Sequence, residues 1–552
     1  MCLQVTIVLS VSYSPFLLMS LGLCLQFLFL FAMPSLGSIY SMSLSSFSLL
    51  DLDMLFIFDR LSIMFLMMVL AVSAVVMLFG SPYMISSLHN VAFTFSMLIF
   101  IVSMVILSVS GSLFWLFLGW DGLGISSFIL IIFNKNWSSS KSGLVTFLMN
   151  RLGDMLMIVA TSCLLIQGSF SSGLTAAESV VFTVGCLSKS AQFPLLSWLP
   201  EAMAAPTPVS SLVHSSTLVT AGIYALARFG GEVGSWGSVV MFSFFSLVVS
   251  GVSALVSTDL KKVVAYSTLS HISLMIHYLS EGCVDACVLH MVMHAIFKSL
   301  LFMSVGSLIF MNSGYQDARC LSIYGTSTGV ATFALMVSLV SMAGLPYLSG
   351  GLSKEIVLLH SLKFGLFSAS FFLLSVFLTS SYSVRILRIL FSPSSSGLKM
   401  SLNTAFFSFS LNLGMALNIL VVFWAVWTPS WVGFLVHSSS ISVLSKTFMA
   451  GAVLLGGCLG AWNPSFSSLL LLSLPLSSMM LPLMSAISKT TIKASETVNS
   501  IGFEGVTGGV LSFLSQSCST LSVKLDRMSE LFLLSIPSLT LFMSLNWLIN
   551  WL

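Results

Sequence analysis

Long apolar runs, separated by short polar connections, constrain what this chain of 552 residues can fold into. A helix needs about 20 consecutive apolar residues to cross the hydrocarbon core of a bilayer, and within lipid its backbone groups must be hydrogen-bonded inside the segment. The runs therefore predict an all-α, polytopic membrane protein with about fifteen transmembrane helices. They fall at about 5–33, 57–80, 91–110, 112–133, 141–167, 178–200, 208–229, 237–257, 262–280, 284–312, 325–360 (interrupted), 364–391, 405–427, 444–462 and 529–551.

The composition excludes several other classes of protein. Hydrophobic residues make up 57% of the chain and charged residues only 7%, whereas a soluble domain has roughly a quarter of its residues charged. The net charge of +3, without any Lys/Arg-rich tract, predicts no nucleic-acid partner. The nine cysteines form no C-x-x-C pair and no nucleotide-binding fingerprint occurs, so we expect no cofactor and no metal in this chain.

One segment holds groups that an apolar membrane helix normally avoids. Residues 186–222 read CLSKSAQFPLLSWLPEAMAAPTPVSSLVHSSTLVTAG and place Lys189 five positions before Pro194. An ammonium at the bilayer centre costs roughly 2.5–3.5 kcal/mol, and a proline frees backbone carbonyls that must then face protein or water. The pattern is therefore typical of a buried, hydrated ion site.

Asp121, in the apolar stretch LFWLFLGWDGLGISSFILIIF, is the expected partner of Lys189. Burial disfavours the charged form of each group and proximity of the other restores it, so moving one group changes the proton affinity of the other. A packing ion pair is the alternative, although a static buried pair is an unreliable source of stability. Arg151 and Asp154, three residues apart in NRLGDM, are expected to pair with each other.

Several histidines suit a hydrated path for protons. His214 follows two prolines among serines and threonines, although a hydrogen-bonded core histidine is the alternative. His290, His294 and Lys298 recur every four residues and so share one helix face. Two such histidines could ligate a metal, but no H-E-x-x-H arrangement is present and the lysine would repel a cation. A polar face along a water-filled path suits all three residues better.

A second interrupted helix echoes the first in the later half of the chain. The stretch AGLPYLSGGLSKE at 343–355 combines Pro346 with Lys354, as 189–198 combines a proline with a lysine. Paired broken helices that run in opposite directions indicate an inverted-repeat transporter. Glu355 is expected to be a simple neighbour where the helix restarts, and Lys354 is the expected functional residue.

The chain divides into six predicted segments. After residue 463, spaced charges and apolar residues fit a helix along the membrane surface or against partner proteins, with a disordered linker as the alternative. The segments are N-terminal transmembrane helices at 1–90, a first half-channel at 91–230, a second half-channel at 231–392, additional transmembrane helices at 393–463, a lateral amphipathic helix at 464–528 and an anchor helix at 529–552.

The loop charges predict the orientation in the membrane. If the helices alternate in direction, most loop Lys and Arg residues fall on one side, which the positive-inside rule assigns to the matrix or cytoplasm. That side carries Lys135, Lys141, Lys261, Lys262, Arg319, Arg385 and Arg388, and the other side carries Arg228 and Lys363.

Several motifs between about 110 and 360 together carry a specific resemblance. They are GWDGLGISSFIL, NRLGDM, KSAQFPLLSWLPEAMAAPTPVSSLVHSSTLVTAGIY, DLKKVVAYSTLSHISLM, HAIFKSLLFMSVGSLI, QDAR and AGLPYLSGGLSKE. In this combination they resemble the chain 5 family of the mitochondrial NADH:ubiquinone oxidoreductase, respiratory complex I, and more broadly the Mrp-type antiporter subunits. The later part of the chain is similar to that family in its architecture of further helices, lateral helix and anchor.

The resemblance implies a proton-translocating core membrane subunit of NADH:ubiquinone reductase, with two inverted antiporter-like repeats and no redox centre of its own. NADH, FMN, iron–sulfur clusters and ubiquinone are then expected in other subunits. The implied partners are the other membrane and accessory subunits of complex I, membrane lipids and protons. The implied location is the mitochondrial inner membrane, which the chain would cross many times.

The resemblance also implies roles for individual residues in a proton relay. It assigns Asp121 and Lys189 to an acid–lysine pair, His214 to a bridging site, His290, His294 and Lys298 to a central axis, Lys354 to the end of the second half-channel, and Asp154 to an acid beside the first. The family more often has Glu at the position of Asp121, so the shorter side chain leaves room for a water before Lys189.

Three functions stay open at this point. They are the proton-translocating subunit, a stand-alone Mrp-type cation/proton antiporter, and a structural membrane strut whose buried charges are vestigial. The long segment before the final anchor favours the first over the second, because a stand-alone transporter has no neighbour that needs such a brace.

Overall fold

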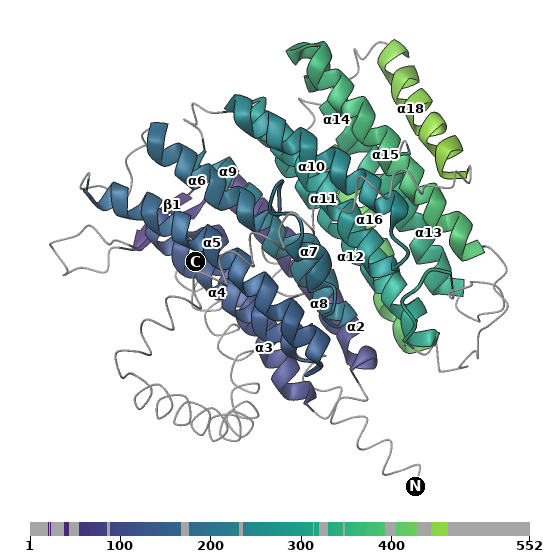
Figure 1. Cartoon of the computed structure of the whole chain (residues 1–552), viewed down its shortest axis with the longest axis horizontal. Coiled ribbons are helices and arrows are strands. Elements are labelled where there is room, and N and C mark those ends of the chain that lie inside the picture. Colours follow the sequence, from purple (N-terminus) through teal and green to yellow (C-terminus); the bar gives the residue numbers. More distant parts are fainter. Residues whose placement is uncertain are drawn as a thin grey trace, which may run out of the picture.

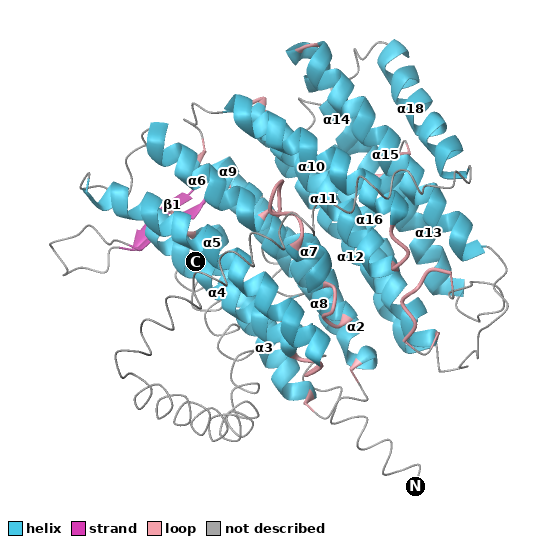
Figure 2. Cartoon of the chain, viewed as in Figure 1, coloured by secondary structure: helices cyan, strands magenta, loops and turns pink. Residues whose placement is uncertain are grey.

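The computed structural model describes residues 54–84, 89–166, 176–230, 236–312, 314–319, 329–345, 348–391, 405–427 and 443–461, together with 38–42 and the single residues 20 and 23. Helices dominate this part of the chain and pack against one another as a bundle (Figures 1 and 2). In chain order they are α2 (Arg60–Tyr83), α3 (Asn90–Val109), α4 (Leu113–Ile132), α5 (Trp137–Ile166), α6 (Ala176–Lys189), α7 (Trp198–Ala202), α8 (Thr207–Leu212), the π-helix η1 (Val213–Thr217), α9 (Leu218–Phe229), α10 (Trp236–Val256), α11 (Leu260–Ser280), α12 (Val284–Met311), α13 (Gly329–Ala343), α14 (Ser349–Phe364), α15 (Leu366–Phe391), α16 (Ala405–Trp427) and α18 (Val443–Ala461).

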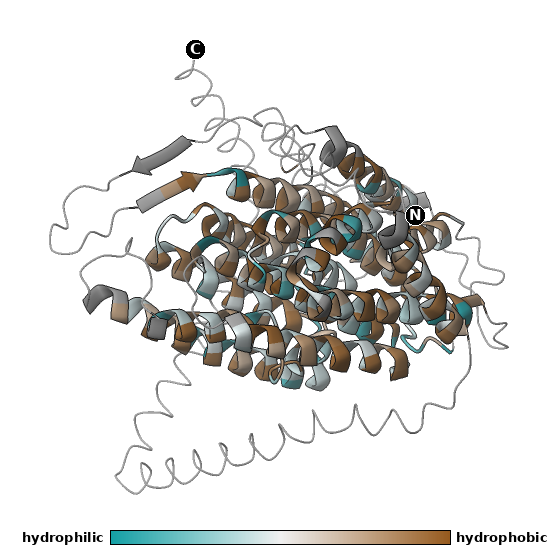
Figure 3. Cartoon of the chain, turned by 90° about the horizontal axis from the view of Figure 1, so that it is seen from above, coloured by the Kyte–Doolittle hydropathy of each residue, from teal (hydrophilic) through white to brown (hydrophobic). Residues whose placement is uncertain are grey.

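The predicted membrane fold is confirmed. Each apolar run predicted between 57 and 462 contains a helix, and apolar residues occur along all of these helices (Figure 3). Within the described residues, 8 helices are long and apolar enough to cross a membrane, and shorter apolar helices accompany them. The predicted run at 5–33, apart from residues 20 and 23, lies outside the described residues, as do the lateral helix at 464–528 and the anchor at 529–552. The segment boundaries stay predictions.

A short antiparallel hairpin precedes the first described membrane helix. Strand β1 (Ser38–Met42) pairs with β2 (Met54–Phe58), with Ser38 opposite Phe58. This strand pair was not predicted, and it is a small addition to a chain that is otherwise helical in its described part. The sequence MLFIF is rich in strand-forming residues, but such a short apolar run cannot be told from the start of an apolar helix by its periodicity.

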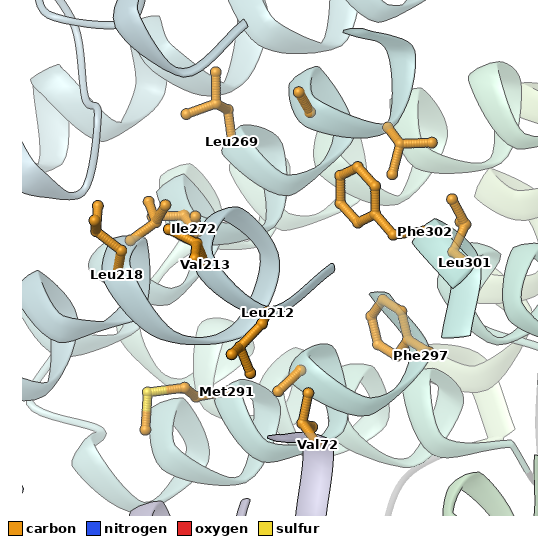
Figure 4. Close-up of a cluster of buried hydrophobic side chains, with 14 of the residues drawn as sticks. Val72, Leu212, Val213, Leu218, Leu269, Ile272, Met291, Phe297, Leu301 and Phe302 are labelled. Carbon is orange, nitrogen blue, oxygen red and sulfur yellow. The ribbon is translucent and has the colours of Figure 1, made fainter. Parts of the chain in front are cut away.

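Helix α12 lies at the centre of the bundle. It packs against α2, α8, α11, α13, α14 and α16, and its most apolar stretch is wholly buried. Figure 4 shows a cluster of buried apolar side chains to which α12 contributes together with α2, α8, η1, α9 and α11. Because protein rather than lipid covers α12 on every side, polar side chains on this helix do not face hydrocarbon.

Two of the predicted membrane helices are interrupted. The chain leaves α6 at Lys189 and continues through α7 to α8 and α9, with Ala191 in a left-handed conformation at φ 52°. In the later half, α13 ends at Ala343 and α14 begins at Ser349. Gly344 between them has φ +91°, a conformation that glycine adopts readily. Both predicted breaks are therefore present, although Pro346 itself lies outside the described residues.

The loops predicted to share the positive side meet at one end of the bundle. Asn134 donates a hydrogen bond to the Ala204 carbonyl at 3.2 Å, and the Lys261 Nζ donates to the Ala205 carbonyl at 3.1 Å. Further hydrogen bonds at this end join Leu260 to Gln316, Ala318 to Thr258, and Arg385 to Ser257. This end of the bundle is called the basic end below, and its orientation in a membrane stays a prediction.

Candidate functional site

Lys189 ends α6 and is almost fully buried, with 1% of its surface exposed. Its Nζ donates a hydrogen bond to the carbonyl of Trp120 at 2.5 Å and lies 4.3 Å from the centroid of the Trp120 ring. An aromatic face attracts a cation, most strongly where water is excluded. The predicted burial of Lys189 is therefore present, and a backbone carbonyl and an indole ring hold its amino group.

Asp121 does not form the predicted ion pair with Lys189. Its carboxylate pairs instead with the guanidinium of Arg151 on α5. Successive residues of a helix point about 100° apart. Because Trp120 faces Lys189, the next residue on α4 is turned away, and the Asp121 side chain is 33% exposed. The structure therefore gives Asp121 the partner Arg151 and not the expected partner Lys189, and the functional role of Asp121 stays a prediction.

Asp154 is the carboxylate that faces the buried side. Its Oδ1 accepts a hydrogen bond from Trp120 Nε1 at 2.8 Å, and its Oδ2 lies 3.2 Å from Arg151 Nη1, which confirms the predicted Arg151–Asp154 pair. A Cβ on neighbouring Gly153 would lie 1.9 Å from the Ser188 Oγ, so the absence of a side chain lets α5 and α6 approach closely. Trp120 thus joins Lys189 and Asp154 in one network, which the sequence analysis missed.

His214 lies in the π-helical turn η1, between α8 and α9. Single π-helical turns occur frequently at functional sites. The imidazole is fully buried, and neither ring nitrogen has a hydrogen-bond partner among the described protein groups. Its ring lies edge-on to Trp198, 6.5 Å between centroids, and Trp198 Nε1 donates to the carbonyl of Ser188 beside Lys189. His214 therefore adjoins the lysine site without bonding to it.

A cluster of three imidazoles lies between α11 and α12. His271 Nδ1 is 3.2 Å from His290 Nε2, and the His271 and His294 rings are 5.3 Å apart. His290 Nδ1 also hydrogen-bonds to Ser353 Oγ at 2.9 Å, whereas both nitrogens of His294 lack a described protein partner. The structure thus brings the predicted His290 and His294 together and adds His271. These three residues are called the imidazole cluster below.

His271 was not predicted, because the spacing of polar residues along α12 reveals only residues of that helix. His271 reaches the cluster from the neighbouring helix α11, so no spacing within α12 could reveal it. The sequence of α11 nevertheless indicates a polar face, since Ser267 and His271 are four residues apart and therefore lie on the same side of the helix.

Lys298 and Lys354 both contact Met342. Lys298 Nζ donates to Ser267 Oγ at 2.6 Å and approaches Met342 Sδ at 3.1 Å. Lys354 Nζ donates to the carbonyl of Met342 at 2.8 Å and to Thr379 Oγ1 at 2.9 Å. Both side chains are fully buried. Lys354 thus hydrogen-bonds to backbone at the end of α13, where carbonyls otherwise lack partners and a cation is favourable.

The arrangement suits the movement of protons between buried sites. Every predicted lysine and histidine is buried, and each lysine is held by carbonyl, hydroxyl, thioether or aromatic groups. A desolvated ammonium held by neutral groups can change its charge when a neighbouring charge moves. Buried polar groups without protein partners are normally hydrogen-bonded to ordered water. In the described part of the chain, no group of three or more His, Cys, Asp or Glu residues is arranged to hold a metal ion.

A sequence profile of the family described as "NADH:quinone oxidoreductase/Mrp antiporter, TM" matches residues 110–379, the region that contains the site. The chain is 38% identical over 382 residues to "NADH-ubiquinone oxidoreductase chain 5" of Caenorhabditis elegans, a match that covers 68% of this chain and 71% of that one. The chain belongs to the NADH-ubiquinone oxidoreductase chain 5 family. It is also 38% identical over 355 residues to the protein of that name from Anopheles quadrimaculatus, with 62% of each chain covered.

A solved structure shares the fold of this family member. It comes from the Mrp complex of Dietzia sp., with a TM-score of 0.73 and 22% sequence identity. The match covers 95% of this chain and 63% of the Dietzia chain. The fold of the chain 5 family member is therefore that of an antiporter-like membrane protein.

Proposed function

We propose that the chain is a proton-translocating core membrane subunit of respiratory complex I in the mitochondrial inner membrane. It moves protons through buried Asp, Lys and His side chains and water, driven by electron transfer from NADH to ubiquinone. That electron transfer, with its NADH, FMN, iron–sulfur clusters and ubiquinone, takes place in other subunits. The chain contributes to NADH:ubiquinone reductase as a partner of the other membrane and accessory subunits.

One observation carries this proposal: buried proton-exchanging groups follow one another through a membrane-spanning bundle. They are Lys189, His214, the imidazole cluster, Lys298 and Lys354, which are all buried and lie on helices that pack within one bundle. Burial of so many ionisable side chains is expensive, and groups of this kind inside a membrane mark ion pathways and proton relays. The names of the similar proteins support a place in complex I.

A stand-alone cation/proton antiporter is the second candidate, and the fold shared with the Mrp chain favours it. The same buried groups would serve that function with a cation gradient in place of electron transfer. Identity of 38% to the chain 5 relatives, against 22% to the Mrp chain, supports the complex I subunit more strongly.

The test replaces Lys189 by methionine in the assembled complex, with Lys298→Met beside it. Methionine fills a similar volume without an exchangeable proton, and a positioned proton-transfer group contributes roughly 100-fold or more to a rate. We expect proton translocation in proteoliposomes to fall by about tenfold or more in each variant, with assembly intact. Unchanged quinone reduction and unchanged proton translocation in both variants would leave only the strut function. Proton-coupled cation exchange without NADH or quinone would favour the antiporter.

A further inference from the structure

Beyond the predicted relay, a second group of ionisable side chains lies where α11 ends and α12 begins. His277 and Glu281 occupy the last turn of α11 and the position after it, with Nε2 and Oε1 3.1 Å apart. Their side chains are buried, at 2% and 7% exposure. The sequence analysis assigned no role to either residue.

Several buried side-chain oxygen and nitrogen atoms in this region have no hydrogen-bond partner among the described protein groups. Tyr278 Oη, both nitrogens of His277 and both carboxylate oxygens of Glu281 have no hydrogen bond to the protein groups that the structure describes. The His277–Glu281 contact has the distance of an ion pair without the angles of a hydrogen bond. An unsatisfied buried polar atom costs about 1–3 kcal/mol, more if charged, so several together indicate a site that binds ordered water.

The same groups adjoin the imidazole cluster. The Tyr278 ring lies edge-on to His290 with 6.4 Å between centroids, and its centroid is 6.3 Å from that of His277. His290 is six residues into α12, which places it only about 9 Å along the axis from the start of that helix. The imidazole cluster therefore lies close to this end of the bundle.

These groups lie at the end of the bundle opposite the basic end. Helix α11 starts at Leu260 beside the basic loops and ends at Ser280, so His277 and Glu281 lie far from those loops. Gly282 and Asp285 are exposed there. Cys283 Sγ and His360 Nδ1, 3.3 Å apart, are partly buried at this end, and the Phe371 ring packs on the His277 ring with 4.0 Å between centroids.

We propose that Tyr278, His277 and Glu281 form a proton-conducting branch between the imidazole cluster and the end of the bundle opposite the basic end. A proton reaches His277 through water bridged by the Tyr278 hydroxyl, and is taken up on Nδ1. The proton on Nε2 then passes to the Glu281 carboxylate, which releases it through water to the exposed turn at Gly282. The imidazole is left neutral with its proton on Nδ1, and bridging water moves that proton back to Nε2, so no net charge is left behind. This branch rests on the proposed proton-translocating function.

The test uses Glu281→Gln in the assembled complex, with Asp285→Asn as the matched control. Both changes remove one carboxylate at the same end of the bundle, but the Asp285 side chain is exposed and lies outside the branch. We expect Glu281→Gln to lower proton translocation about tenfold, and Asp285→Asn to leave it unchanged. Glu281→Asp, which keeps a carboxylate, restores most of the rate.

Two further measurements cover a failure of Glu281→Gln to assemble and detect the protonated Glu281 side chain directly. His277→Gln keeps hydrogen-bonding groups but cannot carry a proton, so it replaces Glu281→Gln if that variant fails to assemble. Infrared difference spectra of the working complex should contain a carboxylic-acid band that disappears in Glu281→Gln. Wild-type pumping in Glu281→Gln or His277→Gln, alongside a loss in Lys298→Met, overturns the branch and leaves the proposed function standing. Wild-type pumping in all three overturns both.

Discussion

At the scale of single residues, Arg151 holds two carboxylates that differ sharply in exposure. Asp121 is partly exposed, whereas Asp154 is buried at 2% exposure and bonded to Trp120. Only Asp154 shares a hydrogen-bonded neighbour with Lys189. We therefore expect Asp154→Asn to lower proton translocation by about tenfold or more, and Asp121→Asn to lower it less. The measurement is proton uptake into proteoliposomes by each assembled variant.

The control for this pair is Asp259→Asn. Asp259 contacts Lys262 at 3.1 Å at the start of α11, where the pair is largely exposed and contributes little. Pumping should be unchanged in this variant. A larger loss in Asp121→Asn than in Asp154→Asn would mean that the exposed carboxylate serves Lys189 after all, as the sequence first predicts.

The sequence predicts which residues belong to the relay better than it predicts which of them contact each other. A lysine or histidine inside an apolar run is visible in the sequence, because its burial is expensive wherever it lies. The partner of that side chain depends on which way a neighbouring helix is rotated, which one-helix periodicity does not determine. Trp120 and His271 were missed for this reason, and Asp121 was paired with the wrong cation.

At the scale of helices, the break between α13 and α14 depends on close backbone contact. A Cβ on Gly350 would lie 1.8 Å from the Ser341 carbonyl oxygen, and backbone cannot move aside as a flexible side chain can. Overpacking of this kind costs about 1–3 kcal/mol or more. Gly350→Ala should therefore lower the thermal unfolding temperature and the yield of assembled complex.

Gly451→Ala in α18 supplies the comparison for this prediction. A Cβ there meets nothing within 4 Å, and alanine stabilises a helix interior by roughly 0.5–1 kcal/mol relative to glycine. The two substitutions should thus shift the unfolding temperature in opposite directions. An unchanged temperature in Gly350→Ala would show that α13 and α14 separate without cost.

Element positions were predictable because the apolar runs are long and the breakers are proline and glycine. The two interruptions at Lys189 and near Gly344 followed from the same signals. The hairpin of β1 and β2 was missed because the predicted apolar run at 57–80 took the end of MLFIF as the start of a helix, although the N-cap Asp59 separates β2 from α2. The π-helical turn at His214 also escaped prediction, because it changes the register of a helix without interrupting its apolar pattern.

At the scale of the whole molecule, charge is distributed unevenly between the two ends of the bundle. Loops with Lys135, Lys261 and Arg319 gather at the basic end, beside the hydrogen bonds that join α11 to the chain after α12. The positive-inside rule predicts that this end faces the matrix, in the location proposed above. The branch at Glu281 then opens on the opposite side, so the proposed relay connects to both sides of the membrane.

This topology can be tested with a membrane-impermeant maleimide and two single substitutions. Gln316→Cys places a thiol at the basic end, and Asp285→Cys places one at the opposite end; both positions are exposed. In sealed, oriented mitoplasts, Asp285→Cys should react from outside, whereas Gln316→Cys should react only after the membrane is opened. The unsubstituted chain, treated in parallel, gives the background from the native cysteines. The helices between these two positions pack as one unit, so they share one orientation. Labelling of Gln316→Cys from outside would therefore show that the whole bundle has the opposite orientation. The Glu281 branch would then lead to the other side of the membrane.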